Sequence, residues 1–289
     1  MRLGLGTVQF GGGYGIANRT GQVDHSEALQ ILKQARQNGV DTIDTAITYG
    51  DSETRLGCLG VEDFKLITKL PPLPRKITSV ENWVKKQVKD SIARLKVNTL
   101  HGLLLHRAGD LVGENGVSIF RSIESLKDSG CIQKFGVSIY NPQELDALPG
   151  ISRIDLVQAP LNLIDRRLLM DGWLNRLKAN DIEVHVRSVF LQGLLLMPRK
   201  RIPSQFERWA SLWDAWEHYL VNTKTSAVAA CLSYPLSIDK VDKVIVGVDS
   251  SAQWECIVKQ AQSSMKVNEW PSMASCDEAL LNPSKWITS

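Results

Sequence analysis

The sequence predicts an α/β fold, a closed (β/α)8 TIM barrel. Three observations lead to this prediction: eight short apolar segments, amphipathic segments between them, and a length of 289 residues, which such barrels reach as one domain. Hydrophobic residues make up 43% and charged residues 22% of the chain, a composition typical of a globular protein with a large core. We therefore expect a single domain over residues 1–289.

The eight apolar segments have the length of strands that are buried on both faces of a parallel sheet. They are Leu3–Phe10, Thr42–Ala46, Lys65–Leu70, Gly102–His106, Gln133–Ile139, Asp155–Pro160, Glu183–Val189 and Val244–Val248. Repeated strand–helix units give parallel strands with helices outside. Eight such units favour a closed barrel over an open sheet.

The segments between the strands show the 3.6-residue period of amphipathic helices. In Ser26–Gln37, Ala28 and Leu32 fall on one face, Ser26 is the expected N-cap, and Gly39 is the expected stop. The other predicted helices are Val80–Leu95, Ser118–Lys127, Arg166–Ala179, Ser226–Leu236 and Ser251–Gln262.

Two regions depart from the repeat: an insertion at about 194–223 and a tail at about 266–289 that we expect to fold over one barrel end. The insertion opens with the basic run Arg199–Arg201, which is either a solvated loop or a clamp for a phosphate. Tryptophans in both regions are either helix-packing core or walls of a substrate pocket. These tryptophans are Trp209, Trp213 and Trp270.

The bulk properties argue against several classes of protein. A net charge of +3, evenly spread, does not favour a nucleic-acid partner. No apolar run is long enough for a membrane span, and the N-terminus does not resemble a signal peptide. The five cysteines show no CxxC spacing, so we expect reduced thiols, no structural metal and a cytoplasmic protein.

Reactive residues follow three consecutive predicted strands. Asp44 lies near the end of the second strand with Tyr49 in the next loop, Lys69 lies near the end of the third, and His106 ends the fourth. The carboxyl ends of barrel strands meet at one opening, so these four side chains should surround it. Each has an ordinary explanation alone, as a turn cap, a strand end or a loop contact. Their joint pattern favours a catalytic site.

This set of residues suits the reduction of a carbonyl. A carbonyl that accepts hydride needs a proton, and tyrosine, with a pKa of about 10, is a weak acid at neutral pH. We expect the Lys69 ammonium to lower the pKa of Tyr49, and Asp44 to keep Lys69 charged. His106 would donate a hydrogen bond to the carbonyl oxygen and fix its direction.

These motifs resemble the aldo-keto reductase family over nearly the whole chain. Residues 44–57, DTAITYGDSETRLG, are similar to the family's DTAxxYGxSExxLG motif, and 67–69 and 103–106 resemble its lysine and histidine strands. The resemblance implies an NAD(P)H-dependent oxidoreductase that interconverts an aldehyde, ketone or sugar with its alcohol. It also implies a catalytic tetrad with tyrosine as the proton donor. The tetrad residues are Asp44, Tyr49, Lys69 and His106.

The cofactor is expected from the same resemblance. No GxGxxG fingerprint precedes a helix, which suits a family that holds its dinucleotide extended across the barrel mouth. The resemblance implies that Ser138 and Gln158 bind the nicotinamide carboxamide and that Arg187 stacks on its ring. The complete set expected to contact the cofactor is Gly6, Thr7, Ser138, Gln158, Arg187, Ser188, Gly193, Gly247, Ser250, Ser251 and Gln253.

The adenosine end of the expected cofactor site is atypical. Gln253, Cys256 and Ile257 stand where family members often have Arg, Glu and Asn, and Asp249 would repel a 2′-phosphate. The helix that begins at Ser251 would offer free N–H groups to a phosphate. We expect NADPH from the habit of the family, with NADH as the alternative.

Two rival functions remain open. The chain is either an enzyme or a regulatory, cofactor-binding protein on the same barrel, like the potassium-channel β subunits that resemble this family. In an unrelated barrel lyase or isomerase, Lys69 would instead be a Schiff-base nucleophile. As partners we expect a small-molecule carbonyl or sugar substrate, no membrane, and a monomer or small homo-oligomer.

Overall fold

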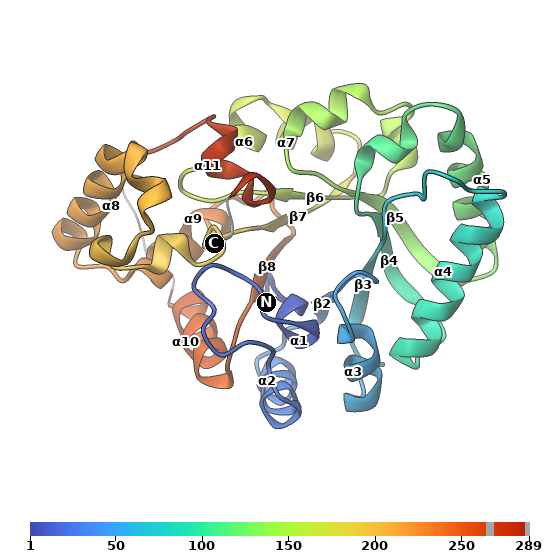
Figure 1. Cartoon of the computed structure of the whole chain (residues 1–289), viewed down its shortest axis with the longest axis horizontal. Coiled ribbons are helices and arrows are strands. Elements are labelled where there is room, and N and C mark those ends of the chain that lie inside the picture. Colours follow the sequence, from blue (N-terminus) through green and yellow to red (C-terminus); the bar gives the residue numbers. More distant parts are fainter. Residues whose placement is uncertain (264–268, 287–289) are drawn as a thin grey trace.

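Eight parallel strands close into a barrel in chain order, β1 to β8, with helices around it (Figure 1). The computed structural model describes residues 1–263 and 269–286. The strands are β1 Leu3–Gly6, β2 Thr42–Asp44, β3 Lys65–Leu70, β4 Leu100–Leu105, β5 Ile132–Ser138, β6 Leu156–Pro160, β7 Glu183–Arg187 and β8 Lys243–Gly247. Pairing of β1 with β8, with Leu3 opposite Val244, closes the ring. The predicted (β/α)8 fold is confirmed.

The helices lie outside the barrel, as the amphipathic pattern predicts. They are α1 Val8–Gly11, α2 His25–Gln37, α3 Ser52–Leu59, α4 Val80–Leu95, α5 Glu114–Asp128, α6 Arg167–Met170, α7 Trp173–Lys178, α8 Ala210–Thr223, α9 Ala227–Leu236, α10 Ser251–Gln262 and α11 Glu278–Leu281. The bounds of α4 and α10 agree with the predicted ranges. Short 3-10 turns complete the loops, and three of them lie between β7 and α8.

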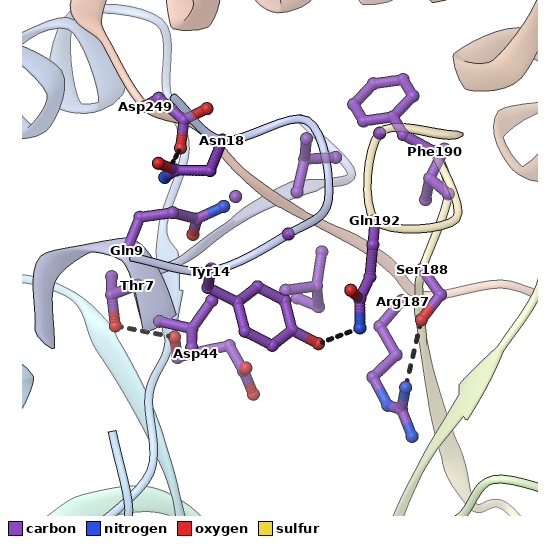
Figure 2. Close-up of a pocket in the computed structure, with 18 of the residues that line it drawn as sticks. Thr7, Gln9, Tyr14, Asn18, Asp44, Arg187, Ser188, Phe190, Gln192 and Asp249 are labelled. Carbon is purple, nitrogen blue, oxygen red and sulfur yellow. Dashed lines mark hydrogen bonds between the residues drawn. The ribbon is translucent and has the colours of Figure 1, made fainter. Parts of the chain in front are cut away.

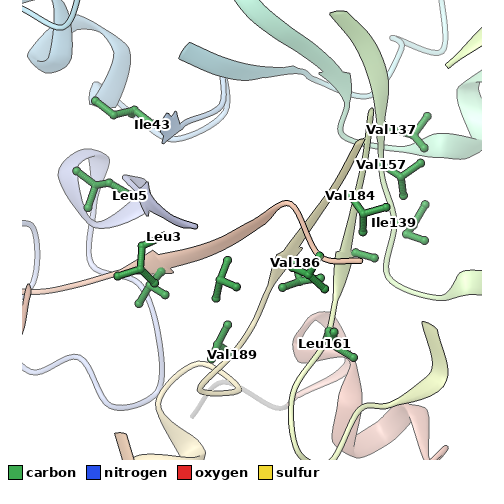
Figure 3. Packing of buried hydrophobic residues seen from close by; sticks show 14 of the residues in the cluster. Leu3, Leu5, Ile43, Val137, Ile139, Val157, Leu161, Val184, Val186 and Val189 are labelled. Carbon is green, nitrogen blue, oxygen red and sulfur yellow. The ribbon is translucent and has the colours of Figure 1, made fainter. Parts of the chain in front are cut away.

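Apolar side chains on the two faces of the strands form separate cores. Residues such as Leu5, Ile43 and Val184 belong to the main cluster beneath the helices (Figure 3). A smaller cluster of Ile67, Leu104 and Leu156 fills the inside of the barrel. Ile67 precedes Lys69 by two positions, so both side chains point inward, and the apolar cluster forms the floor below the polar residues at the carboxyl ends.

Two expectations near the N-terminus are wrong. The first strand ends at Gly6 rather than Phe10, because the chain turns into the short helix α1 after Thr7. Asp24, not Ser26, is the N-cap of α2: its carboxylate accepts the Glu27 N–H at 2.8 Å. Ser26 lies in the first turn and donates its hydroxyl proton to the same carboxylate.

Two helices also differ from the prediction. The segment 166–179 forms α6 and α7 instead of one helix, because Gly172 adopts a φ of 74° that ends the first turn. Helix α3, which begins within the sequence motif of residues 44–57, was not predicted. It packs closely on α4, since a Cβ on Gly57 would lie 2.1 Å from the carbonyl oxygen of Arg94.

Side chains of the insertion pack against one another and against the hydrophobic core. Trp213 is buried and donates its indole N–H to the carbonyl of Phe206 at 2.9 Å, so it does not line a substrate pocket. Arg199 pairs with Glu207 and Asp214, so this cation of the basic run is held by acidic partners within the insertion. The sharper hypothesis of a phosphate clamp is therefore not favoured for Arg199.

The described part of the tail packs on the loops at the carboxyl ends of the strands. Helix α11 lies near α6 (Figure 1). Glu278 in α11 accepts a hydrogen bond from Asn141 at 2.7 Å and lies 3.3 Å from Arg167 of α6. Trp270 meets Tyr234 of α9 edge to face, with ring centroids 5.2 Å apart. Residues 266–268 and 287–289 of the predicted tail lie outside the described residues.

Within residues 1–263 and 269–286, no helix is both long enough and apolar enough to span a bilayer. All five cysteines are free. In the same ranges, no group of three or more metal-binding side chains comes together.

Candidate active site

A cavity of about 780 Å³ opens at the carboxyl ends of the strands (Figure 2). At one end it is lined by Tyr49 and His106, and at the other by Gln253, Cys256 and Ile257. Most of the predicted site residues lie on its wall. These are Gly6, Thr7, Asp44, Tyr49, His106, Ser138, Arg187, Ser188, Gly193, Gly247 and Gln253. Lys69, Gln158, Ser250 and Ser251 are not on the wall.

Lys69 lies directly behind the wall in a buried ion pair. Its Nζ is 2.6 Å from Oδ2 of Asp44 and donates a second hydrogen bond, of 2.8 Å, to the carbonyl of Thr45. The Lys69 side chain is 1% exposed and the Asp44 side chain 6%. Burial lowers the pKa of Lys69, and the Asp44 carboxylate opposes this shift. The pair thus keeps an ammonium group next to the cavity.

Tyr49 lies between this ammonium and the histidine. The Lys69 Nζ is 5.0 Å from the centroid of the Tyr49 ring, and the His106 ring meets the tyrosine edge to face at 5.9 Å. The structure therefore brings together the four side chains that the sequence pattern placed on consecutive strands. Their roles in a reaction belong to the proposal below.

The expected lowering of the Tyr49 pKa is not found. Burial raises the pKa of Tyr49, and the negative charge of Asp44 raises it further, while Arg187 opposes them. The physical reason is that the same carboxylate that balances Lys69 also disfavours a phenolate. The tyrosine is therefore protonated at neutral pH.

His106 is held as a neutral imidazole. Burial, aided by the positive charges of Lys69 and Arg187, lowers its pKa from 6.5 to about 4. Its Nδ1 lies 3.2 Å from the hydroxyl of Thr48. A neutral ring has one N–H donor, so the imidazole retains the ability to donate one hydrogen bond.

Gln158 differs from its expected role. It is fully buried on β6, donates from Nε2 to Oδ1 of Asp44 at 2.7 Å, and accepts a 3.4 Å hydrogen bond from Ser138. It therefore orients the carboxylate of the ion pair instead of facing the cavity. Ser138 and Asp44 line the cavity, so the network meets the cavity at these two side chains.

The loop that carries Tyr49 is fixed by a close backbone approach. A Cβ on Gly11 would lie 1.7 Å from the carbonyl oxygen of Tyr49, and Gly50, with φ of 53°, lies against the Gly11 carbonyl. Below the loop, the buried carboxylate of Glu53 accepts hydrogen bonds from Thr68 and Ser91, both of 2.6 Å. These contacts tie the loop and α3 to β3 and α4.

Several lining residues were missed by the sequence analysis. Tyr14 and Gln192, joined by a 3.1 Å hydrogen bond, connect the N-terminal loop to the loop after β7 (Figure 2). Gln9 and Tyr140 also line the cavity. The glycine-rich run 11–13 was the available signal for a loop at the mouth, because such runs allow close approach of backbone to ligand.

Two N–H groups at the N-terminus of α10 donate to protein side chains. The Ser250 hydroxyl caps the helix by accepting the Gln253 N–H at 3.2 Å, and the Ser251 N–H donates to Glu27 of α2 at 3.2 Å. Neither serine lines the cavity, in contrast to the expectation for a cofactor phosphate. Asp249, just before the helix, does line it.

The cavity suits an extended dinucleotide. It joins the Tyr49 corner to α10, and Gly247 leaves room for the Gln9 side chain on its wall, since a Cβ at Gly247 would lie 2.4 Å from Oε1 of Gln9. That Oε1 is buried and has no hydrogen-bond partner among the described residues, so it is an available acceptor at the cavity. Ser138, Arg187 and Ser188 add donors nearby.

The fold and the site define a class: (β/α)8 barrel proteins with a cavity at the carboxyl-end mouth, here lined by Tyr49 and His106. The model of the aldo/keto reductase family matches residues 2–278, and the chain belongs to this family. The resemblance found in the sequence is thereby confirmed.

Individual relatives agree with this assignment. The chain is 27% identical over 204 residues to the uncharacterized oxidoreductase YqkF of Bacillus subtilis, covering 67% of this chain and 62% of YqkF. It is 29% identical over 140 residues to a 6-dehydroglucose reductase of Novosphingobium aromaticivorans, covering 43% and 45% of the two chains. The chain thus spans less than two thirds of the length of these relatives.

Solved structures show the same fold. The holo form of the aldo-keto reductase AKR11C1 from Bacillus halodurans superposes with a TM-score of 0.69 at 22% identity, covering 91% of this chain and 87% of that chain.

Proposed function

We propose that this protein is an NAD(P)H-dependent oxidoreductase that reduces the carbonyl of an aldehyde, ketone or sugar, with Tyr49 as the proton donor. The observation that carries the proposal is the placement of Tyr49 and His106 on one cavity wall, directly in front of the buried Lys69–Asp44 pair. Reduced nicotinamide, when bound, supplies the hydride.

Tyr49 is suited to give up a proton only when charge develops on the substrate. Burial and Asp44 keep its hydroxyl protonated before the reaction. An alkoxide is a much stronger base than a phenolate, so proton transfer from Tyr49 to the newly formed alkoxide is favourable. The positive charge of Arg187 favours the phenolate that remains, and the Lys69 ammonium lies 5.0 Å from the centroid of the same ring.

His106 orients the substrate. Its neutral ring has one N–H available to donate to the carbonyl oxygen, which places that oxygen near the Tyr49 hydroxyl. The ring itself is positioned by Thr48 and by its edge-to-face contact with Tyr49.

Arg187 biases the site toward reduction. It donates to the carbonyl of Ile139 at 2.8 Å and to the Ser188 hydroxyl at 3.1 Å, and makes no ion pair with a carboxylate of the described residues. An unbalanced guanidinium on the wall disfavours the positively charged, oxidised nicotinamide relative to the neutral, reduced form. We assign Ser138, Arg187, Ser188 and Gly193 to cofactor binding.

The proposal is tested with a panel of aldehydes, ketones and sugars and a cofactor that carries deuterium at the transferred position. We expect carbonyl-dependent oxidation of the cofactor and recovery of the deuterium on the carbinol carbon of the product. A chain that binds the cofactor but turns over no member of the panel would favour the regulatory alternative.

The lyase or isomerase hypothesis is disfavoured by the position of Lys69. A Schiff-base lysine must reach the substrate carbonyl, but this Nζ lies behind the wall and is held by Asp44 and Thr45. Failure of borohydride to trap any carbonyl compound on Lys69 is the expected result.

A further inference from the structure

The end of the cavity opposite Tyr49 is formed by the loop after β8 and the first turns of α10. Asp249, Gln253, Cys256 and Ile257 line it. If hydride is exchanged beside Tyr49, as proposed above, the other half of an extended dinucleotide, its adenosine, must lie at this end. The inference below rests on that function.

A carboxylate of the wall faces this end. Asp249 accepts a 2.8 Å hydrogen bond from Nδ2 of Asn18 (Figure 2). The backbone N–H of Asp249 donates to Oε1 of Gln253 at 2.9 Å. Burial raises the pKa of Asp249, and the groups that oppose this shift are the uncharged side chains of Asn18 and Gln253. The position is thus unfavourable for a second negative charge.

A second carboxylate occupies the helix terminus. Oε2 of Glu27, from the first turn of α2, accepts the Ser251 N–H at 3.2 Å, and the Ser250 hydroxyl takes the N–H of Gln253. The free N–H groups at a helix start are what makes it a phosphate site. At the start of α10, two of these N–H groups already donate to protein oxygens, and one of the two oxygens belongs to a charged carboxylate.

Asp249 lies on this part of the wall and Glu27 lies off it at the adjoining helix terminus, and no ammonium or guanidinium of the described residues lines the cavity beside Asp249. Among the described residues that line the cavity, Arg187 is the guanidinium, and its charge acts on Tyr49 and His106 at the other end. Arg19, next to Asn18 in the sequence, is exposed and off the wall.

We infer that this chain selects NADH over NADPH, and that Asp249 and Glu27 are the residues that reject the 2′-phosphate. This reverses the expectation taken from the habit of the family. A phosphate dianion brought beside Asp249, in a partly dry cavity and without a cation on the wall, is repelled rather than bound, and Glu27 adds a second negative charge at the adjoining helix terminus.

The test is a binding titration of the full chain with NADH and with NADPH in the absence of substrate. Binding is monitored by the change in nicotinamide fluorescence. We expect NADH to bind at least about tenfold more tightly. The same order should hold for 5′-AMP against 2′,5′-ADP in competition. Equal affinities, or tighter NADPH binding, would overturn the inference and leave the proposed function intact. Binding of neither cofactor would contradict the inference and the proposed function together.

A double variant tests whether the two carboxylates cause the preference for NADH. Glu27→Gln with Asp249→Asn keeps the shapes and removes both charges, and we expect NADPH affinity to rise until the two cofactors differ by less than about threefold. Glu255→Gln, on the exposed part of α10 and off the wall, is the matched control and should keep the NADH preference. A paired variant that keeps the full preference would contradict the assignment to these residues.

Discussion

The amide of Gln158 donates a 2.7 Å hydrogen bond to one carboxylate oxygen of Asp44, while the other oxygen, at 2.6 Å, holds Lys69. All three side chains are buried, and they come from β6, β2 and β3. The two contacts, with Gln158 and with Lys69, hold the Asp44 carboxylate from both sides. The position of the ammonium behind Tyr49 therefore depends on a strand on the far side of the barrel.

Loss of this contact should be measurable. Gln158→Leu leaves a buried carboxylate oxygen without its donor, which costs about 1.5–3 kcal/mol of stability. We expect kcat to fall by about tenfold or more, because Lys69 is no longer held in one position. Gln143→Leu, at an exposed glutamine in the loop after β5, is the control and should change neither quantity. Unchanged kcat in Gln158→Leu would contradict the positioning role.

The close approach of Gly11 to Tyr49 gives a second prediction. Gly11→Ala forces the tyrosine loop to move, since the new Cβ would lie 1.7 Å from its carbonyl oxygen. A displacement of this kind costs about 10²-fold in turnover. Gly109→Ala, where nothing lies within 4 Å of the new Cβ, should behave like the parent chain. Steady-state kinetics of the two variants compares them directly.

The buried ion pair should dominate the response of stability to substitution. Lys69→Met leaves Asp44 charged and buried without its partner, and we expect the free energy of unfolding at neutral pH to fall by about 3–5 kcal/mol. The double variant Lys69→Met with Asp44→Asn should recover most of this loss. Urea unfolding measures both, and a single variant within about 1 kcal/mol of the parent would show that the pair is not needed for stability.

The lowered pKa of His106 predicts that the stability of the fold depends on pH. Its pKa is 6.5 when unfolded and about 4 in the fold, so the unfolded chain binds more protons between these values. The contribution of neutral His106 to the free energy of unfolding is present above pH 6.5. It is lost as the pH falls toward 4, and the loss amounts to up to about 3 kcal/mol. The difference in unfolding free energy between the parent and His106→Gln should shrink over this window. Parallel curves would refute the assignment.

The sequence predicted the barrel and the four residues around Tyr49 because strand period and strand ends are local properties. It did not predict the electrostatics. Asp44 raises the pKa of Tyr49, and Gln158 turns away from the cavity, through contacts between strands that are distant in the chain. The α10 terminus was misjudged for the same reason: the carboxylate that fills it comes from α2.

The most direct test of the central claim is Tyr49→Phe, which removes the proton donor and keeps the ring against His106 and Lys69. We expect cofactor affinity to stay within about threefold while kcat falls by about 10²–10⁴-fold. Tyr219→Phe, which removes a hydroxyl on α8 off the cavity wall, should keep full turnover. Full turnover by Tyr49→Phe on a substrate that the parent chain reduces would contradict the account.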